Sequence, residues 1–137
     1  MLCSNTKELP ETALLIFQCE SLKKESVMKD KKLLGYYGEE LAAGMLYAQG
    51  YDILERNYRC RFGEADIICR NNEELFVVEV KTRTSLLYGR PACAVDGVKQ
   101  KRLRQIGKMY LLAKKLTNLS VKFQVVEILV RQNYFGV

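Results

Sequence analysis

The chain has 137 residues, of which 48% are apolar and 28% charged, a balance typical of a single globular domain and not of a disordered segment. It contains no histidine, which excludes serine and cysteine triads that depend on an imidazole, and its five cysteines form no CxxC pair of the kind that binds zinc. Residues 81–137 carry twelve basic and two acidic side chains, against ten and fourteen in residues 1–80, and this basic half either serves solubility or meets a polyanionic partner such as nucleic acid.

Residues 1–33 show no clear periodicity and are expected to form an N-terminal extension, either a short helix or a flexible arm. Their apolar patch "TALLIF" is far too short to span a bilayer, and no cleavage-like segment of a signal peptide follows it. The sequence therefore predicts a cytoplasmic protein with no membrane partner.

Residues 34–50 predict an amphipathic helix that Gly50 ends. Its apolar stripe recurs at spacings of three and four residues: Leu34, Tyr37, Leu41, Met45 and Ala48. Glu39 borders this stripe, so its side chain is either a solvated helix glutamate or a group turned toward the interior.

Three strands are predicted next, in "YDILERNYRC", "EADIICR" and "LFVVEVKTR", joined by the turns "RFG" and "NNEE". The apolar content of the third strand predicts that it is central and covered on both faces. The order helix, strand, strand, strand favours an antiparallel meander with helices packed on it.

Residues 84–95 read as a loop because Gly89 and Pro91 interrupt any regular element, and Asp96 can cap a helix running to about Leu116. "VKFQVVEILV" is the last predicted strand. The helix has seven positive charges and no acid, and they form either a solvated face or a polyanion-binding face: Lys99, Lys101, Arg102, Arg104, Lys108, Lys114 and Lys115.

The tripeptide "EVK" at the end of the third strand places Glu79 and Lys81 on one face. If the strands pair through "NNEE", Asp66 meets Glu79 from the neighbouring strand, and two opposed carboxylates repel each other. A divalent cation such as Mg²⁺, which prefers oxygen ligands, would resolve this conflict. The alternative from the tripeptide alone is an ordinary ion pair at a strand end.

Four blocks in the order "GEELA", "GEADII", "VVEVKTR" and "VKQKRL" resemble the YraN-like family of bacterial proteins, over about Gly35 to Leu112. That family is similar to the PD-(D/E)XK nuclease superfamily and to archaeal Holliday-junction resolvases. The resemblance implies an α/β fold over residues 34–137, with a restriction-endonuclease-like core in which helices flank a central mixed β-sheet. It also implies Mg²⁺ or Mn²⁺ as the cofactor.

The resemblance assigns roles residue by residue. Asp66 and Glu79 match the metal-binding acids, Lys81 matches the catalytic lysine, and the backbone carbonyl of Val80 matches a further metal ligand. Glu39 matches a helix glutamate that completes the catalytic site, directly or through water.

Other positions of the resemblance are less defined. Glu64 matches an acid to which no role can be assigned, and Gln124 stands where the family usually has an aspartate, which puts in doubt an acidic contribution from the last strand. The expected nucleic-acid-binding side chains are Lys99, Lys101, Arg102 and Arg83.

The function expected on these grounds is metal-dependent hydrolysis of DNA phosphodiester bonds at branched or otherwise structured sites, with RNA left open as a substrate. The alternative is a nucleic-acid-binding or DNA-processing accessory protein that keeps the scaffold and does not cleave. A third reading is an interaction protein whose basic helix binds an acidic protein. A homodimer is expected only by analogy with junction resolvases.

Overall fold

The computed structural model describes residues 12–18, 30–84 and 97–131, with side chains for 30–84 and 97–130. These ranges contain two helices and five strands. In chain order they are β1 (Thr12–Gln18), α2 (Lys31–Ala48), β2 (Asp52–Cys60), β3 (Gly63–Asn71), β4 (Glu74–Arg83), α3 (Gly97–Lys114) and β5 (Ser120–Arg131).

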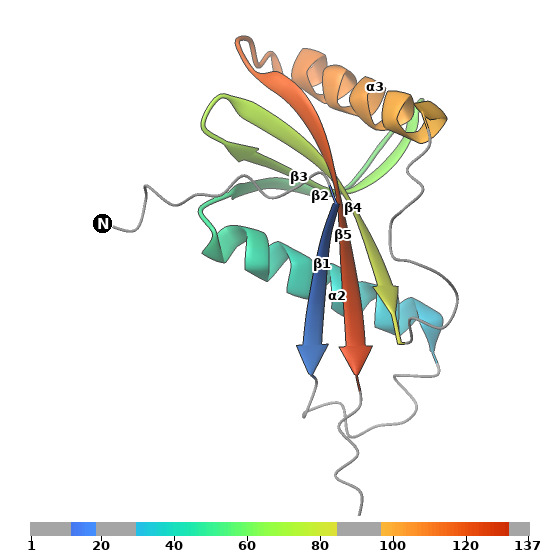
Figure 1. The fold of residues 1–137 in the computed structure, drawn as a ribbon. Helices are drawn as coiled ribbons and strands as arrows, with labels where there is room; N and C mark the ends of the chain where they lie inside the picture. Colours follow the sequence, from blue (N-terminus) through green and yellow to red (C-terminus); the bar gives the residue numbers. More distant parts are fainter. Residues whose placement is uncertain (1–11, 19–29, 85–96, 132–137) are drawn as a thin grey trace, which may run out of the picture.

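All five strands belong to one mixed sheet with the order β1-β5-β4-β3-β2 (Figure 1). Strands β2, β3 and β4 form the predicted antiparallel meander, while β5 pairs with β4 in parallel and β1 with β5 in parallel. The predicted α/β class with a mixed sheet flanked by helices is therefore confirmed. The meander is only part of the sheet, because two parallel strands extend it.

Residues 12–18 form an edge strand, where the sequence analysis expected a short helix or a flexible arm. Strand β1 runs beside β5 from Thr12, opposite Val125, to Gln18, opposite Arg131. The open edge of β5 offers backbone groups that a seven-residue apolar segment can pair with, and this favours a strand over an isolated short helix.

Each helix covers one face of the sheet (Figure 1). On one side α2 packs on a cluster of buried strand residues that includes Ile67, Val78 and Val126. On the other side α3 packs on Ile68, Val77 and other residues of a second buried cluster. Neither of these two helices is long and apolar enough to cross a membrane.

The ends of α2 follow from local chemistry. Asp30 is the N-cap, and its carboxylate accepts hydrogen bonds from the backbone N–H groups of Lys32 and Leu33 at 3.0 and 3.3 Å. Past the C-terminal end, Gly50 adopts a φ of 93°, which a side chain would disfavour. The helix predicted over 34–50 is thus confirmed, beginning three residues earlier. The expected cap at Asp96 lies outside the described residues.

Strands β3 and β4 pair only as far as Ile67 and Val78 and then part. Beyond this point β4 keeps β5 as its partner, from Glu79 to Arg83, while β3 continues beside β2. In β4 the residues from Leu75 to Val78 are buried, whereas those from Glu79 to Arg83 are half-buried. The sheet therefore opens a gap at the point where the charged end of β4 begins.

The packing of α2 on β4 generates the first prediction. Gly38 faces Thr82 so closely that a Cβ at position 38 would overlap the threonine side chain, whereas a Cβ at Gly44 of the same helix would meet nothing within 4 Å. We expect Gly38→Ala to lower the free energy of unfolding by about 1–3 kcal/mol through overpacking. Gly44→Ala should raise it by about 0.5–1 kcal/mol, since glycine is a poor helix former.

Urea unfolding followed by circular dichroism would measure both changes. Equal stability of the two variants would contradict the close approach of α2 to β4.

Candidate active site

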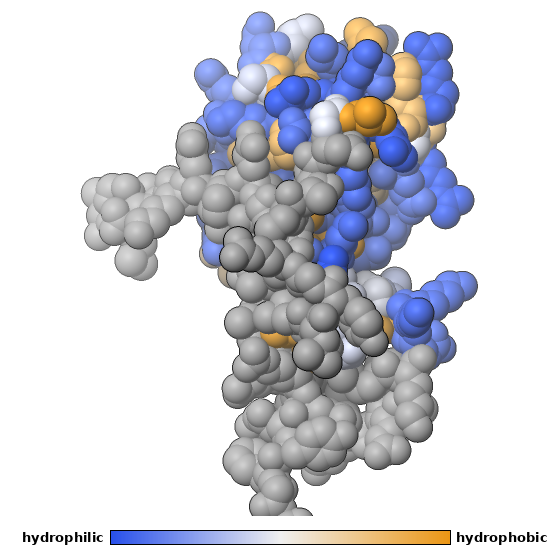
Figure 2. Space-filling model, turned by 45° about the vertical axis from the view of Figure 1, so that its right-hand side comes forward, coloured by the Kyte–Doolittle hydropathy of each residue, from blue (hydrophilic) through white to orange (hydrophobic). Residues whose placement is uncertain are grey.

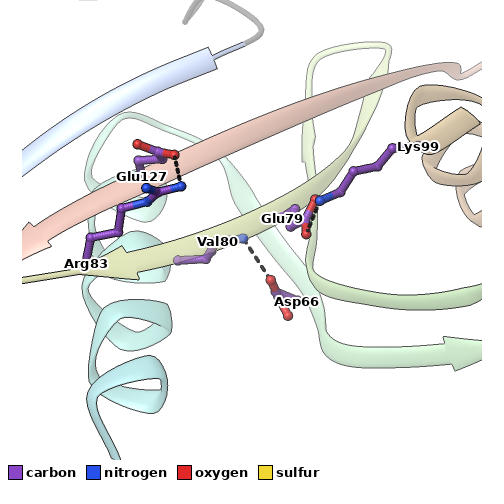
Figure 3. Close-up of polar contacts among 6 residues, drawn as sticks. All are labelled: Asp66, Glu79, Val80, Arg83, Lys99 and Glu127. Atoms are coloured by element: carbon purple, nitrogen blue, oxygen red, sulfur yellow. Dashed lines mark hydrogen bonds and ion pairs between the residues drawn. The ribbon is translucent and has the colours of Figure 1, made fainter. Parts of the chain in front are cut away.

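The gap between β3 and β4 is occupied by the Asp66 side chain. Its Oδ2 accepts a hydrogen bond from the backbone N–H of Val80 at 2.7 Å (Figure 3). A carboxylate thus replaces the ladder acceptor that β3 no longer supplies to β4. Ala65 packs on the side of α3, whereas Ile67, two residues later, packs on the side of α2. Residues two apart in a regular strand point to the same face, so the alternation of side chains in β3 is interrupted at Asp66.

Glu39 reaches the same point from α2, where its carboxyl group lies beside that of Asp66. Burial raises the pKa of Glu39, and the neighbouring charge of Asp66 raises it further, although Arg56 opposes the shift. Burial also raises the pKa of Asp66, against the lowering effect of the Val80 N–H. The neutral form of each acid is therefore favoured more here than it is in water.

Glu79 lies on β4 next to this pair and is held from the other side by α3. Its Oε1 forms an ion pair of 2.7 Å with the Nζ of Lys99 (Figure 3). Its Oε2 is buried and has no hydrogen-bond partner among the described residues. Lys99, expected to contact phosphate, thus neutralises one of the acids here.

The pairing of β3 with β4 stops one position before Asp66 and Glu79. Ile67 pairs with Val78, so Asp66 and Glu79 stand in the next position of the same hairpin, where the strands separate. The negative charge of Glu79 raises the pKa of Asp66, which shows that the two carboxylates repel each other. Within residues 30–84 and 97–130, however, no three side chains of the metal-binding types already surround one point.

Lys81 and Arg83 follow Glu79 on the same face of β4. The Nη2 of Arg83 forms an ion pair of 3.7 Å with Oε1 of Glu127 on β5 (Figure 3). Glu127 was not recognised from the sequence, although it is a single acid inside the apolar run "VVEILV". Such a charge in a buried strand is the signal that could have identified it.

The remaining predicted residues lie around the site. Glu64 is exposed and pairs with Arg59 of β2 at 3.4 Å, and its charge contributes to the raised pKa values of Glu39 and Asp66. Lys101 and Arg102 are exposed on α3, and Gly63 lies against the aliphatic stem of Arg102.

A second contact missed by the sequence analysis fixes α2 against the sheet. Arg56 of β2 pairs with Glu40 of α2 at 2.7 Å, next to Glu39 in the sequence. This ion pair helps to hold Glu39 beside Asp66.

The donor set fits a divalent cation in its chemistry. Glu39 and Asp66 lie together at the gap with pKa values raised by burial, and Glu79 lies next on β4 with a buried oxygen that has no partner among the described residues. Oxygen donors of this kind are what Mg²⁺ and Mn²⁺ prefer. For all three to enclose one ion, Glu79 would have to turn from Lys99 toward Asp66.

Comparison with known proteins places this chain among proteins without an assigned activity. Residues 38–128 match the model of the uncharacterised protein family UPF0102. The chain is 48% identical over 94 residues to a UPF0102 protein of Syntrophus aciditrophicus, covering 69% of this chain and 74% of that protein. A UPF0102 protein of Moorella thermoacetica is 46% identical over 94 residues, covering 69% and 78%. One from Nocardia farcinica is 43% identical over 100 residues, covering 73% and 79%.

The raised pKa values of Glu39 and Asp66 generate a prediction on stability. Because both folded-state values lie above the unfolded ones, the stability that these groups contribute is present at low pH and is lost as the pH rises through the folded pKa. We expect Asp66→Asn to raise the melting temperature at pH 7 by a few degrees, where ~1 kcal/mol corresponds to roughly 4 °C. Asparagine keeps an acceptor for the Val80 N–H.

Differential scanning calorimetry over a series of buffers from acidic to neutral pH would measure this. Asp52→Asn, which removes an exposed acid of β2, is the matched control. A lower melting temperature for Asp66→Asn at neutral pH would contradict the repulsion between the carboxylates.

Proposed function

The chain belongs to the uncharacterised protein family UPF0102, and we propose that it is a metal-dependent nuclease that hydrolyses DNA phosphodiester bonds on a restriction-endonuclease-like core. The observation that carries the proposal is the pair of acids Glu39 and Asp66 at the parting of β3 and β4, with the charge of Glu79 near enough to act on Asp66. Acids brought together at a cost in repulsion are typical of a site that binds a cation. Branched or structured DNA is the proposed substrate, and its cleavage is the proposed reaction.

Glu39, Asp66 and Glu79 would hold Mg²⁺ or Mn²⁺, together with the backbone carbonyl of Val80. When bound, such an ion lowers the pKa of a coordinated water and neutralises charge on the phosphate oxygens. Asp66 is oriented for this by the Val80 N–H, which binds one of its two oxygens.

Lys81 and Lys99 supply positive charge on either side of Glu79. Lys81 follows two residues later on the same face of β4 and would stabilise the negative charge that develops on the phosphate. Lys99 pairs with Glu79 at 2.7 Å and would contact phosphate once Glu79 turns toward a cation. No histidine is needed for either role.

The surface proposed to contact nucleic acid is α3, which has six cations and no acid in its eighteen residues. Five of these side chains are exposed: Lys101, Arg102, Arg104, Lys108 and Lys114. Figure 2 shows hydrophilic side chains with scattered apolar ones over the upper part of the molecule, where α3 lies in Figure 1. Because the first turn of α3 carries Lys99, beside Glu79, this basic surface is continuous with the proposed active site.

A second candidate function is nucleic-acid binding without cleavage. The specific observation in its favour is the ion pair of Glu79 with Lys99, which satisfies one acid with a cation of the chain itself. The same residues would then act as a scaffold, and α3 alone would account for binding.

Cleavage assays distinguish these two functions. With Mn²⁺ present, we expect cleavage of linear, flapped or four-way-junction DNA, and we expect Glu79→Ala and Asp66→Ala each to reduce the rate by at least about a hundredfold, because each removes a proposed metal ligand. Glu73→Ala, which removes an exposed acid of the same hairpin, should cleave like the wild type.

Cleavage that persists in both Glu79→Ala and Asp66→Ala would refute the assignment of the active site. Tight binding by the wild type without cleavage of any of the three substrates would favour the accessory function.

The role of α3 makes a separate prediction on salt dependence. Replacing Lys101 and Arg102 by glutamine should weaken DNA binding and flatten the slope of log K against log salt by about 0.9 for each phosphate that is no longer neutralised. Fluorescence anisotropy over a range of NaCl concentrations would measure the slope. Lys31→Gln on α2, also exposed, is the control that should leave the slope unchanged. An unchanged slope in the Lys101 and Arg102 variants would exclude α3 as the phosphate-binding surface.

A further inference from the structure

Glu127 is a buried acid that neither the resemblance nor the proposed active site accounts for. It lies in β5, beside Lys81 of β4 in the parallel register, and only 1% of its surface is exposed. Neighbouring residues in register point to the same face, so Glu127 shares the face of Glu79, Lys81 and Arg83. The buried carboxylate therefore stands at the charged end of β4.

This carboxylate is poorly satisfied. Both of its oxygens are buried without a hydrogen-bond partner among the described residues, and its ion pair with the Nη2 of Arg83 spans 3.7 Å, too long for a hydrogen bond. Burying a charge with so little compensation costs stability, and an apolar side chain of similar size would serve the core better. Stability of the sheet is thus a poor reason for an acid at this position.

The partner of Glu127 is only partly buried. The Arg83 side chain is 31% exposed, and Glu127 approaches one of its terminal nitrogens. A guanidinium has five N–H donors in a planar fork, so a carboxylate on one edge leaves the other donors available in a fixed direction. Phosphate is the ligand that such a fork binds with two parallel hydrogen bonds.

We propose that Glu127 is a positioning residue that orients Arg83, and that Arg83 so held binds a phosphate of the nucleic-acid strand beside Glu79 and Lys81. The inference rests on the proposed function for the identity of the strand. It adds a phosphate subsite on the β5 side of the active site, opposite the side that Lys99 approaches from α3. In this arrangement Glu127 acts through Arg83 and does not touch the substrate.

Binding of a short fluorescein-labelled DNA duplex, measured by anisotropy without divalent metal, tests the subsite. We expect Glu127→Gln, Glu127→Met and Arg83→Gln each to weaken binding about tenfold, the effect of removing one charge-assisted hydrogen bond. The double variant of Arg83→Gln with Glu127→Gln should bind no more weakly than Arg83→Gln alone, because both changes remove the same interaction.

Glu74→Gln is the matched control. Glu74 pairs with Lys122 at 2.8 Å between the same two strands, at their opposite end, so its replacement should change duplex binding by less than about twofold.

Thermal unfolding separates a positioning role from a structural one. Glu127→Met should not lower the melting temperature, because it removes an unsatisfied buried charge, whereas Arg83→Met should lower it by leaving that charge without its ion pair. Glu127→Gln should also alter the ¹⁵N resonance of the Arg83 Nε–H group, which reports the side chain's orientation without any DNA.

Three results would overturn the inference: duplex binding unchanged in Arg83→Gln, binding unchanged in both Glu127 variants, or a wild-type protein that does not bind the duplex. A melting temperature lowered in Glu127→Met with binding unchanged would assign Glu127 a purely structural role. If the wild type cleaves DNA and the variants bind it as tightly as the wild type, the phosphate subsite is refuted and the proposed nuclease function is not. If the variants bind more weakly but the wild type never cleaves, the subsite is supported and the proposed nuclease function is refuted.

Discussion

The hydrogen bond from the Val80 N–H to the Asp66 carboxylate is the contact on which the charged end of the sheet depends. Strand β4 has to leave β3 to expose its charged half, and a separated strand presents unpaired backbone groups. A side chain of β3 satisfies one of them, so the sheet opens without leaving that donor unpaired. The same contact holds Asp66 in a largely buried place beside Glu39, and this burial raises the pKa of Asp66. The separation of the strands therefore also sets the electrostatics of the site.

Around this split each acid lies beside a group from another element. Glu79 is paired with Lys99 of α3, Glu127 lies 3.7 Å from Arg83 of β4, and Asp66 lies beside Glu39 of α2. Burial opposes the charged forms of Glu39 and Asp66, and it also costs stability at Glu127. The apolar clusters under α2 and α3 supply the stability that allows this concentration of charge.

Local signals explain which parts could be predicted from the sequence. The α2 stripe and the hairpin of β3 and β4 around the "NNEE" turn depend on residues close in the chain, and the structure has them as predicted. The parallel strand β1 could not be predicted, because parallel pairing with β5 involves residues more than a hundred positions apart and has no turn signal. The partner of Lys99 likewise depends on how α3 lies on the sheet. The family resemblance named Asp66 and Glu79 as candidate acids, and only the fold shows that Lys99 lies beside Glu79.

The position of Gln124 shows why the last strand can lack the expected aspartate and still contribute an acid. Gln124 is 1% exposed and pairs in register with Val78, on the face that α2 covers. An ionised aspartate there would be buried among apolar side chains, whereas an amide carries no charge to desolvate. Glu127 lies three residues later and therefore on the opposite face, with Glu79 and Lys81. A polar residue of β5 belongs to the candidate site if it lies on the same face as Glu79. Its nearness in sequence to the expected aspartate does not decide this.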